Sequence, residues 1–483
     1  MGQRTKKNYW ALTVTFLGLC LTGWGTVSCS GSIYRNHDDG GTTEDGIGPV
    51  ADEAGPWADE GSIPPDGGIE TDESSCVPVE PCGSATCGSD SCGTPCGPNG
   101  GLCPQGQTCS APYGKPGVCR EVPQAGNPDG RCSEPLPPEA QPVDTSRPDT
   151  VVGNGTPESC TDDALAAAVA SGGIITFSCG PNPVTIQVTA TLQVPSDRTT
   201  VIDGGNKITL DGGGRVQIFR WEAWDWMTNQ NALVLQHLVV ANGKTTPTEA
   251  IPERPLPCSQ GFNDGEGGAV YIRDGVFRAY DVTFVNNEAA LLGPDTGGGA
   301  VYALGCKAVY ISQCTFKSNR ASNGGGLGSL FATLFIYNSL FEGNEATGHG
   351  ANMDDPSKCD YINNDQHEVG SGGNGGAIYN DGGWGTNVTI CGTQVRYNRA
   401  NAFGAALFFT SNDRSGRLTI RDSLMFENKQ CLDWWQVQPG ISMYEDLYDP
   451  SSIVNSSITR AQNWSAEEDP LCKPYLDEWR QYY

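Results

Sequence analysis

The central part of the sequence alternates apolar and polar residues in short runs separated by glycine-rich turns. Clear examples are residues 308–312, 333–337 and 417–421, where β-branched or aromatic residues recur at every second position. A period of two in short runs is typical of β-strands. No convincing amphipathic helix stands within these repeats. The pattern therefore predicts an all-β region built from many short strands and tight turns.

One sequence pattern returns five times between residues 267 and 429. Its first half is a pair of small residues before an apolar run, and its second half is a bulky residue followed three positions later by Asn. The first halves start at Gly267-Gly268, Gly298-Gly299, Gly325-Gly326, Gly375-Gly376 and Gly404-Ala405. The second halves are Phe284 to Asn287, Phe316 to Asn319, Phe341 to Asn344, Val395 to Asn398 and Met425 to Asn428, preceded by a weaker copy from Val239 to Asn242. Such self-similarity predicts a solenoid in which each repeat forms one coil.

The stacking of coils gives the repeated residues structural roles. The same position in successive coils lies ~4.8 Å apart and is paired by parallel ladder hydrogen bonds. We expect the glycine pairs to form tight turns with positive φ. We also expect the repeated Asn to occupy a left-handed turn and to stack as an internal amide ladder. The interval of 50 residues from Gly326 to Gly376 fits either two coils or one coil with an inserted loop.

The pairing of Gly-Gly-Ala, as at Gly298-Gly299-Ala300, with Phe-x-x-Asn, as from Phe316 to Asn319, resembles a known repeat. It is similar to the repeat of the polymorphic outer membrane proteins, within the wider group of pectin-lyase-like β-helices. The resemblance implies a right-handed parallel β-helix and a place at the cell surface. It implies no particular activity, because one fold serves many functions.

The two ends of the solenoid are predicted from local signals. Thr161 is a candidate N-cap for a short helix over residues 164–170, which ends at Gly172-Gly173. This helix would cover the first coil, as the ends of repeat proteins require. We therefore predict a β-helix with an N-terminal cap over residues 158–430 and a C-terminal cap or extension over residues 431–483.

The first 75 residues carry export and spacer signals. Residues 1–28 have a basic start and an apolar core, as in a secretory signal peptide. Thr26-Val27-Ser28-Cys29 is similar to a bacterial lipobox, which predicts lipid attachment at Cys29 and a place in the outer membrane, with plain secretion as the alternative. Cys20 is the rival site, but Leu19 before it is too large for that cleavage. Residues 29–75 are acidic and rich in Gly and Pro, which predicts a disordered tether.

The 20 cysteines indicate an oxidising compartment. Nine of them fall within residues 76–132, which predicts a small disulfide-rich module, and residues 133–157 are expected to be a Pro-rich linker. We expect eight cysteines to close the module and Cys132 to join the nine later ones. Two pairs are predicted from position, Cys160 with Cys179 and Cys431 with Cys472.

The charge of the chain limits the kinds of partner that it can bind. With 29 basic and 56 acidic residues the net charge is −27. Such an acidic chain is not expected to bind nucleic acid or an anionic membrane. We expect a monomer that meets the membrane only through the N-terminal lipid.

Candidate chemistry lies in the insertions between coils, where aromatic residues and carboxylates gather. A sugar site needs both, because pyranose C–H faces stack on indole and hydroxyl groups bond to acids. Packing of the loops onto the solenoid is the other explanation for these aromatic residues. The candidate ligand-binding residues are Trp221, Trp224, Trp226, Asp264, Glu266, Asp354 and Asp355. Trp434 and Trp435 are expected to cap the open end of the solenoid.

Two functions follow from these features. The first is a non-catalytic surface lipoprotein whose β-helix binds a glycan or a protein as an adhesin. The alternative is a polysaccharide lyase or glycoside hydrolase that uses paired carboxylates. The sequence shows no Ser–His–Asp signature and no metal-ligand His pair. We expect no cofactor, with Ca²⁺ as the one ion that the acidic residues could attract.

Overall fold

The computed structural model describes residues 107–109, 119–121, 131–247, 265–293, 296–348, 372–383, 386–433 and 435–482. The chain divides into units 1–73 and 74–483, and every described residue lies in the second. Cys29, the predicted tether, and the candidate residues Asp264, Asp354 and Asp355 therefore lie outside the described residues, as does Trp434. Of the Cys-rich module, only the backbone of a short antiparallel hairpin and residues 131–132 are described; the hairpin pairs β1 (Gln107–Cys109) with β2 (Cys119–Glu121).

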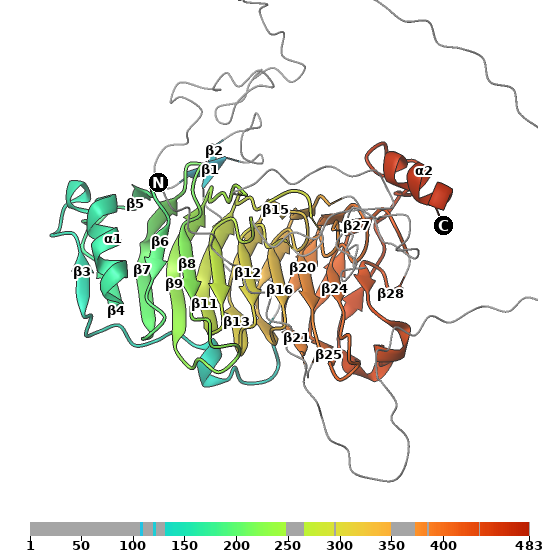
Figure 1. The fold of residues 1–483 in the computed structure, drawn as a ribbon, viewed down its shortest axis with the longest axis horizontal. Coiled ribbons are helices and arrows are strands. Elements are labelled where there is room, and N and C mark those ends of the chain that lie inside the picture. The colour runs from blue at the N-terminus through green and yellow to red at the C-terminus, as the bar shows by residue number, and fades with distance from the viewer. Residues whose placement is uncertain are drawn as a thin grey trace, which may run out of the picture. The chain divides into compact units, whose positions relative to one another are not determined.

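The rest of the described chain forms a parallel β-helix, which confirms the predicted all-β solenoid. Successive coils follow one another from α1 to β28 in Figure 1, and the strands of neighbouring coils pair in parallel. One sheet has nine strands, and only its last pair, β28 with β29, is antiparallel. Its strands are β6 (Leu192–Val194), β8 (Phe219–Glu222), β10 (Val270–Arg273), β12 (Val301–Leu304), β16 (Leu327–Leu330), β20 (Ile378–Asp381), β24 (Leu407–Phe409), β28 (Gln436–Gln438) and β29 (Ile441–Ser442).

A second sheet of sixteen strands covers the next part of each coil, and a third sheet of four short strands follows the repeated Asn. The early strands of the second sheet are β3 (Thr150–Val152), β4 (Gly173–Phe177), β5 (Val184–Gln187), β7 (Thr200–Asp211), β9 (Ala232–Ala241) and β11 (Val276–Val285). Its later strands are β13 (Ala308–Ser312), β14 (Thr315–Lys317), β17 (Leu334–Tyr337), β18 (Leu340–Glu342), β21 (Val388–Cys391), β22 (Gln394–Arg396), β25 (Leu418–Arg421), β26 (Leu424–Phe426), β30 (Ile453–Val454) and β31 (Ser457–Ile458). The third sheet contains β15 (Arg320–Ala321), β19 (Glu345–Ala346), β23 (Arg399–Ala400) and β27 (Lys429–Gln430).

Strand register settles how the repeats stack. Strand β16 pairs directly with β20, and β18 pairs directly with β22. The interval of 50 residues is therefore one coil with an insertion, and residues 349–371 of that insertion lie outside the described residues. In the third copy of the pattern, the sequence placed Gly325 opposite Gly298. Strand pairing shifts this copy by one position, because Leu327 pairs with Val301 and so aligns Gly325 with Gly299. A Cβ at Gly299 would lie 2.1 Å from the carbonyl oxygen of Gly325, so this turn has no room for a side chain.

The interior of the coils is filled by columns of like residues. The rings of Phe284, Phe316 and Phe341 stack with centroids 4.7 and 4.6 Å apart, and all three side chains are fully buried. Parallel pairing places each Phe opposite the Phe of the next coil. Like residues therefore pack on like residues, and each ring contributes its buried area and a stacking contact worth about 1 kcal/mol.

The five repeated asparagines form a buried column beside this stack. Asn287 Nδ2 donates a 2.9 Å hydrogen bond to Asn319 Oδ1, and the same bond recurs from Asn319 to Asn344, from Asn344 to Asn398 and from Asn398 to Asn428. The left-handed turn falls on the residue before each Asn, contrary to our expectation. The residues with positive φ are Asn286, Ser318, Gly343, Tyr397 and Glu427. The repeated Asn itself has a negative φ, and its side-chain amide bonds to the Asn of the next coil.

The weaker copy of the pattern lies outside this column. Pairing of Val240 with Phe284 aligns Asn242 with Asn286, and it aligns Gly243 with Asn287. The Asn242 amide instead donates to Asp211 Oδ2 at 3.0 Å. The column therefore begins at Asn287, whose Oδ1 accepts the backbone N–H of Gly243 at 2.7 Å.

The N-terminal end is closed by α1 (Asp162–Ser171), as predicted for a cap. The Thr161 hydroxyl accepts the backbone N–H of Ala164, and Gly172 ends the helix with φ 67°. Leu165, Ala168 and Val169 are buried against the first coil. The cap therefore removes from water the apolar residues that no earlier coil covers.

Residues 133–157 are packed along the β-helix and do not form the expected linker. Strand β3 pairs with β4, and the single-turn 3₁₀ helix η1 (Pro138–Ala140) packs on β11 and β13. Gln236 exchanges side-chain hydrogen bonds with both backbone groups of Val143, at 2.9 and 3.0 Å. A proline-rich segment can still bind in this way, because side chains of the β-helix supply the partners for its backbone. We call residues 131–152 the strap.

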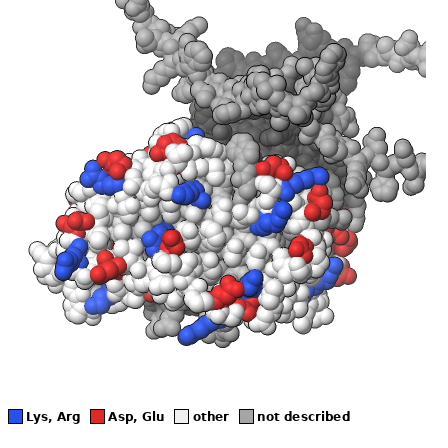
Figure 2. All heavy atoms as spheres, turned by 90° about the horizontal axis from the view of Figure 1, so that it is seen from below, with Lys and Arg blue, Asp and Glu red and all other residues white. Residues whose placement is uncertain are grey.

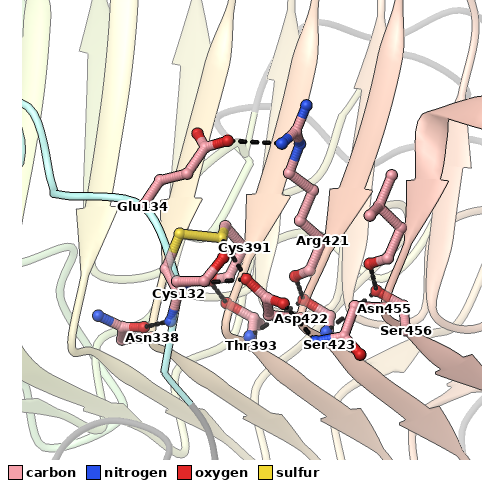
Figure 3. Close-up of a disulfide and its surroundings, with 12 residues drawn as sticks. Cys132, Glu134, Asn338, Cys391, Thr393, Arg421, Asp422, Ser423, Asn455 and Ser456 are labelled. Atoms are coloured by element: carbon pink, nitrogen blue, oxygen red, sulfur yellow. Dashed lines mark hydrogen bonds and ion pairs between the residues drawn. A yellow bond between two sulfur atoms is a disulfide. The ribbon is translucent and has the colours of Figure 1, made fainter.

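A disulfide fastens the strap to a distant coil (Figure 3). Cys132 is bonded to Cys391 at the end of β21, 259 residues later. Asp422 Oδ2 accepts the backbone N–H of Ser133 at 2.8 Å, and Asn338 Oδ1 accepts that of Cys132 at 2.6 Å. Arg421 forms an ion pair with Glu134 at 2.5 Å. The strap thus links late coils to the first ones across the outside of the sixteen-stranded sheet.

Cysteine pairing differs in part from expectation. The structure contains the bonds Cys160–Cys179 and Cys431–Cys472. Cys306 and Cys314 are free thiols, although we expected the later cysteines to pair. Both side chains are fully buried in the core, and burial raises the pKa of each thiol to about 12. They act there as small apolar residues.

The C-terminal end continues past residue 430, the predicted boundary of the β-helix. Strands β30 and β31 pair in parallel with β25 and β26 and so begin another coil. Two 3₁₀ turns, η4 (Glu445–Leu447) and η5 (Pro450–Ser452), precede them, and α2 (Lys473–Tyr482) follows. In the part of the chain that the structure describes, neither α-helix is long and apolar enough to cross a membrane.

Candidate functional site

An exposed aromatic surface lies where β8 leaves the nine-stranded sheet. It consists of Arg220, Glu222, Trp224, Trp226 and Arg273, and we call it the Trp surface. Strand alternation builds it, because Phe219 and Trp221 point into the core while Arg220 and Glu222 point outward. Pairing with β10 then places Arg273 beside Glu222. The loop that follows β8 carries Trp224 and Trp226.

Two arginines hold the aromatic rings of this region. The Arg273 guanidinium carbon lies 3.7 Å from the ring centroid of Trp224, and the Arg220 guanidinium carbon lies 4.6 Å from that of Tyr271. Arg220 also forms an ion pair with Glu222 at 2.8 Å. Trp224 remains 66% exposed. Arg273 covers one face of that indole, so the opposite face is left for a ligand.

The loop after β8 adopts unusual backbone conformations for bulky residues. Trp224, Trp226 and Met227 have φ angles of 60°, 24° and 58°. Positive φ at such residues is strained and is held only where surrounding contacts fix it. The contacts here are hydrogen bonds from Ala223 N–H to the Arg273 carbonyl oxygen and from Met227 N–H to the Gly305 carbonyl oxygen.

Asp274 and the next coils complete this support. The Asp274 carboxylate accepts the backbone N–H of Trp226 and lies 3.5 Å from Arg273 Nε. The Trp226 ring packs edge-on against Phe331 with centroids 5.5 Å apart. It also passes so close to Gly305 that a Cβ there would lie 2.7 Å from the indole. The loop is therefore fixed by three coils, which presents Trp224 in a set position.

Burial sets the direction of the pKa shifts of the two groups that support the Trp surface, Asp274 and Tyr271. Burial raises the pKa of Asp274, and the charge of Arg273 acts in the opposite direction. The Asp274 side chain is only 1% exposed, so it supports the loop and cannot reach a ligand. Burial also raises the pKa of Tyr271, and the charge of Glu266 adds to this effect. The tyrosine therefore stays neutral beneath Arg220 at any physiological pH.

The structure changes the role of two predicted site residues. Trp221 is fully buried, because it occupies an inward position of β8, so it is a core residue that a ligand does not touch. A Cβ at Gly275 would lie 2.9 Å from Trp221 Nε1, which shows how closely this ring is packed. Glu266 is buried at 7% exposure, and its backbone carbonyl oxygen accepts a bond from the Gln217 amide. Trp224 and Trp226 are thus the exposed members of the predicted cluster.

Sequence reasoning missed the two arginines and Phe331. Arg220 and Arg273 could have been found by extending the strand alternation, because they occupy outward positions of β8 and β10 beside the aromatic loop. Phe331 could not, since its contact with Trp226 crosses 105 residues. Trp435, predicted to cap the open end, is half-buried and packs edge-on against Tyr444 with centroids 4.7 Å apart.

Comparison with known proteins gives one match. Residues 281–304 match the family model described as the Chlamydia polymorphic membrane protein (Chlamydia_PMP) repeat. This segment runs from the end of β11 through Phe284 and Asn287 to the end of β12, and so contains both halves of the repeated pattern. No curated protein and no solved structure matches the chain. One segment of the parallel β-helix is therefore similar to the repeat of a membrane protein family.

Proposed function

We propose that the protein is an exported, surface-exposed lipoprotein that binds glycans through the Trp surface without catalysing a reaction on them. The observation that carries this proposal is the exposed Trp224 ring, held at a fixed angle by Arg273 at the edge of a rigid sheet. Preorganised aromatic rings suit sugar binding, because little conformational entropy is lost when the ligand stacks.

Polar groups beside Trp224 supply the partners that hydroxyl groups need. Glu222 and Arg220 lie on the same outward face of β8 and already bond to one another at 2.8 Å. A sugar stacked on Trp224 would find an acceptor and donors at the adjacent strand. Figure 2 shows acidic and basic side chains interspersed with uncharged surface on the face it presents. At the Trp surface itself, Arg220 and Arg273 stand beside Glu222, and such a mixture of signs favours a neutral or weakly charged ligand over a polyanion.

Export and surface exposure are supported by two features. The three disulfides of the described residues require an oxidising compartment. The matched repeat comes from a membrane protein family. We infer that a lipid on Cys29 anchors the chain and that the segment before the strap spaces the β-helix from the membrane. Labelling cells with a radioactive fatty acid tests the anchor: the wild-type protein should be labelled, and Cys29→Ser should not.

Glycan binding is tested on an array with the purified full chain and two matched variants. Trp224→Ala removes the exposed ring, whereas Tyr397→Ala removes a comparable ring, 56% exposed and 6.0 Å from the Arg396 guanidinium, on another face of the coil. We expect Trp224→Ala to weaken binding about tenfold or more, since stacking contacts are worth about 1–2 kcal/mol. Tyr397→Ala should bind as the wild type does.

Two results would overturn the proposal. If no glycan is bound, or if both variants bind equally well, the Trp surface is not a sugar site. The enzyme alternative is tested by incubation with a panel of acidic polysaccharides. Multiple turnover to unsaturated products or new reducing ends would replace the binding protein with a lyase or a hydrolase.

A further inference from the structure

The asparagine column has a direction that makes its two ends unlike. In each of the four links, the backbone N–H and the Nδ2–H of one Asn both donate to Oδ1 of the next Asn toward the C-terminus. The backbone bonds span 2.8–3.1 Å, and the amide bonds are all 2.9 Å. The first Asn of the column therefore presents a hydrogen-bond acceptor, its Oδ1. The last Asn presents two donors, its backbone N–H and its Nδ2–H.

The last member, Asn428, has no Asn above it. Pairing of Met425 with Ile458 aligns Asn428 with Ala461, whose methyl side chain cannot accept a hydrogen bond. Asn428 Nδ2 donates to the Val395 carbonyl oxygen at 2.8 Å, as the earlier members do to their own coils. Its backbone N–H and its second amide hydrogen have no acceptor among the described residues, although Asn428 is only 7% exposed. Polar groups of a buried residue nearly always have a partner, so two unpaired donors at the end of the column point to an acceptor that comes from a ligand or from water.

A pocket of about 270 Å³ lies at this end of the column. Asn428 and Ala461 both line it, together with Gln430, Asp433, Arg460, Trp464 and Glu467. The Gln430 amide is already committed, because its Oε1 accepts from Gly404 N–H and its Nε2 donates to the Leu432 carbonyl oxygen. The two unpaired donors of Asn428 therefore stand among the polar groups that line the pocket.

The wall of the pocket is a fixed structure. Trp464 Nε1 donates to Asp469 at 2.7 Å, and Asp469 forms an ion pair with Arg399 at 2.8 Å. The Cys431–Cys472 disulfide ties the same segment to the coil that ends in Asn428. The Trp464 indole, which lines the pocket, is thereby held in place.

We propose that this pocket binds a neutral acetamido group, as carried by N-acetylated amino sugars, whose carbonyl oxygen takes the place of the missing Asn Oδ1. The column itself shows that an amide oxygen satisfies both donors with normal geometry. A carboxylate is the less suitable ligand, because the pocket is lined by Asp433 and Glu467 against the single cation Arg460. Its volume, near the lower end of ligand sites, suits one sugar residue stacked on Trp464. This site is separate from the Trp surface and does not depend on it.

The test is titration of the full chain with N-acetylglucosamine, glucose and acetamide, followed by calorimetry and by the amide NMR signal of Asn428. We expect N-acetylglucosamine to bind and to shift that signal, acetamide to bind more weakly at the same place, and glucose to leave the signal of Asn428 unchanged. Binding by acetamide as strong as by the sugar would mean that any small amide suffices, and it would overturn the sugar assignment.

Variants separate the pocket from its surroundings. Ala461→Asn supplies the missing amide from within and should abolish binding while the circular dichroism spectrum is kept. Asn428→Asp keeps the acceptor for Asn398 but removes the side-chain donor to the pocket, together with the bond to the Val395 carbonyl oxygen, and it should weaken binding about tenfold. Trp224→Ala is the control that leaves this pocket untouched. Failure of the wild type to bind N-acetylglucosamine, or equal binding by the wild type and both pocket variants, would refute the proposal.

Discussion

The two ends of the β-helix solve different problems. At the N-terminal end, α1 covers the apolar side chains of the first coil, and the asparagine column begins further along the β-helix, at Asn287, whose Oδ1 accepts the backbone N–H of Gly243. At the C-terminal end, a segment fixed by a disulfide and an ion pair surrounds a polar pocket, and the column stops at Ala461. The difference follows from the direction of the column. A chain of amides that all donate one way leaves an acceptor at one end, which a backbone N–H satisfies, and donors at the other.

The sharpest test of this contrast compares a central Asn with the last one. Asn344→Ala removes the acceptor for two donors of Asn319 and the donor to the Phe316 carbonyl oxygen. We expect a loss of roughly 4 kcal/mol in unfolding free energy, because these groups remain buried. Asn428→Ala breaks equivalent bonds, but water can enter from the pocket, so we expect about 2 kcal/mol. Urea unfolding measures both, and equal losses would contradict the difference between the ends.

Much of the column could be predicted from the sequence, because a motif repeated at coil spacing fixes both the fold and the stacking residues. Its ends could not be assigned as easily. Asn242 matched the pattern but is out of register, since strand pairing and not the motif decides which residue stacks. The empty place at Ala461 becomes visible only when Ile458 is aligned with Met425, and this alignment needs β31.

The candidate site was predicted only in part. Alternation within residues 219–222 would have placed Trp221 inward. Because three Trp residues lie close together in the sequence, Trp221 was instead assigned to the ligand site with Trp224 and Trp226. The strap was predicted to be a linker because it is rich in Pro. Its partners, such as Asp422 and Gln236, lie about 90 to 290 residues away, and local sequence carries no signal for such contacts.

Loss of the disulfide at either end should lower the unfolding free energy by a similar amount, but the two losses should differ in their effect on ligand binding. Replacing Cys431 and Cys472 with Ser opens a loop with a sequence separation of 41, and replacing Cys160 and Cys179 opens one of 19. Chain entropy predicts losses of about 4 and about 3 kcal/mol in unfolding free energy. Thermal unfolding measures these losses. Only the C-terminal pair should also abolish binding of N-acetylglucosamine, and loss of binding in the N-terminal variant would contradict this assignment.

Acid should weaken the C-terminal end. Burial works to raise the pKa of Asp469, but bonds from Arg399, Trp464 and the Leu471 backbone outweigh it and lower the pKa to about 2. The unfolded value is near 3.8, so the ion pair stabilises the fold above about pH 4, and this stabilisation is lost as the pH falls toward 2. We expect about 1 kcal/mol, since the pair lies near solvent. Asp469→Asn should remove this part of the pH dependence, and an unchanged profile in that variant would show that another group is responsible.

The smallest effect is expected at the Trp surface. Trp224 is 66% exposed, and Trp224→Ala should change the unfolding free energy by less than about 0.5 kcal/mol while it weakens glycan binding. Thermal unfolding of this variant beside Tyr397→Ala checks the claim. A large loss in Trp224→Ala alone would mean that the ring is structural.

Hydrogen–deuterium exchange of the backbone amides of the five asparagines tests the direction of the column most directly. Slow exchange is expected at Asn287, Asn319, Asn344 and Asn398, because each donates to the next Oδ1. Asn428 should exchange much faster and become protected when N-acetylglucosamine is added. Equal protection of all five without a ligand, or fast exchange at Asn344, would contradict the account.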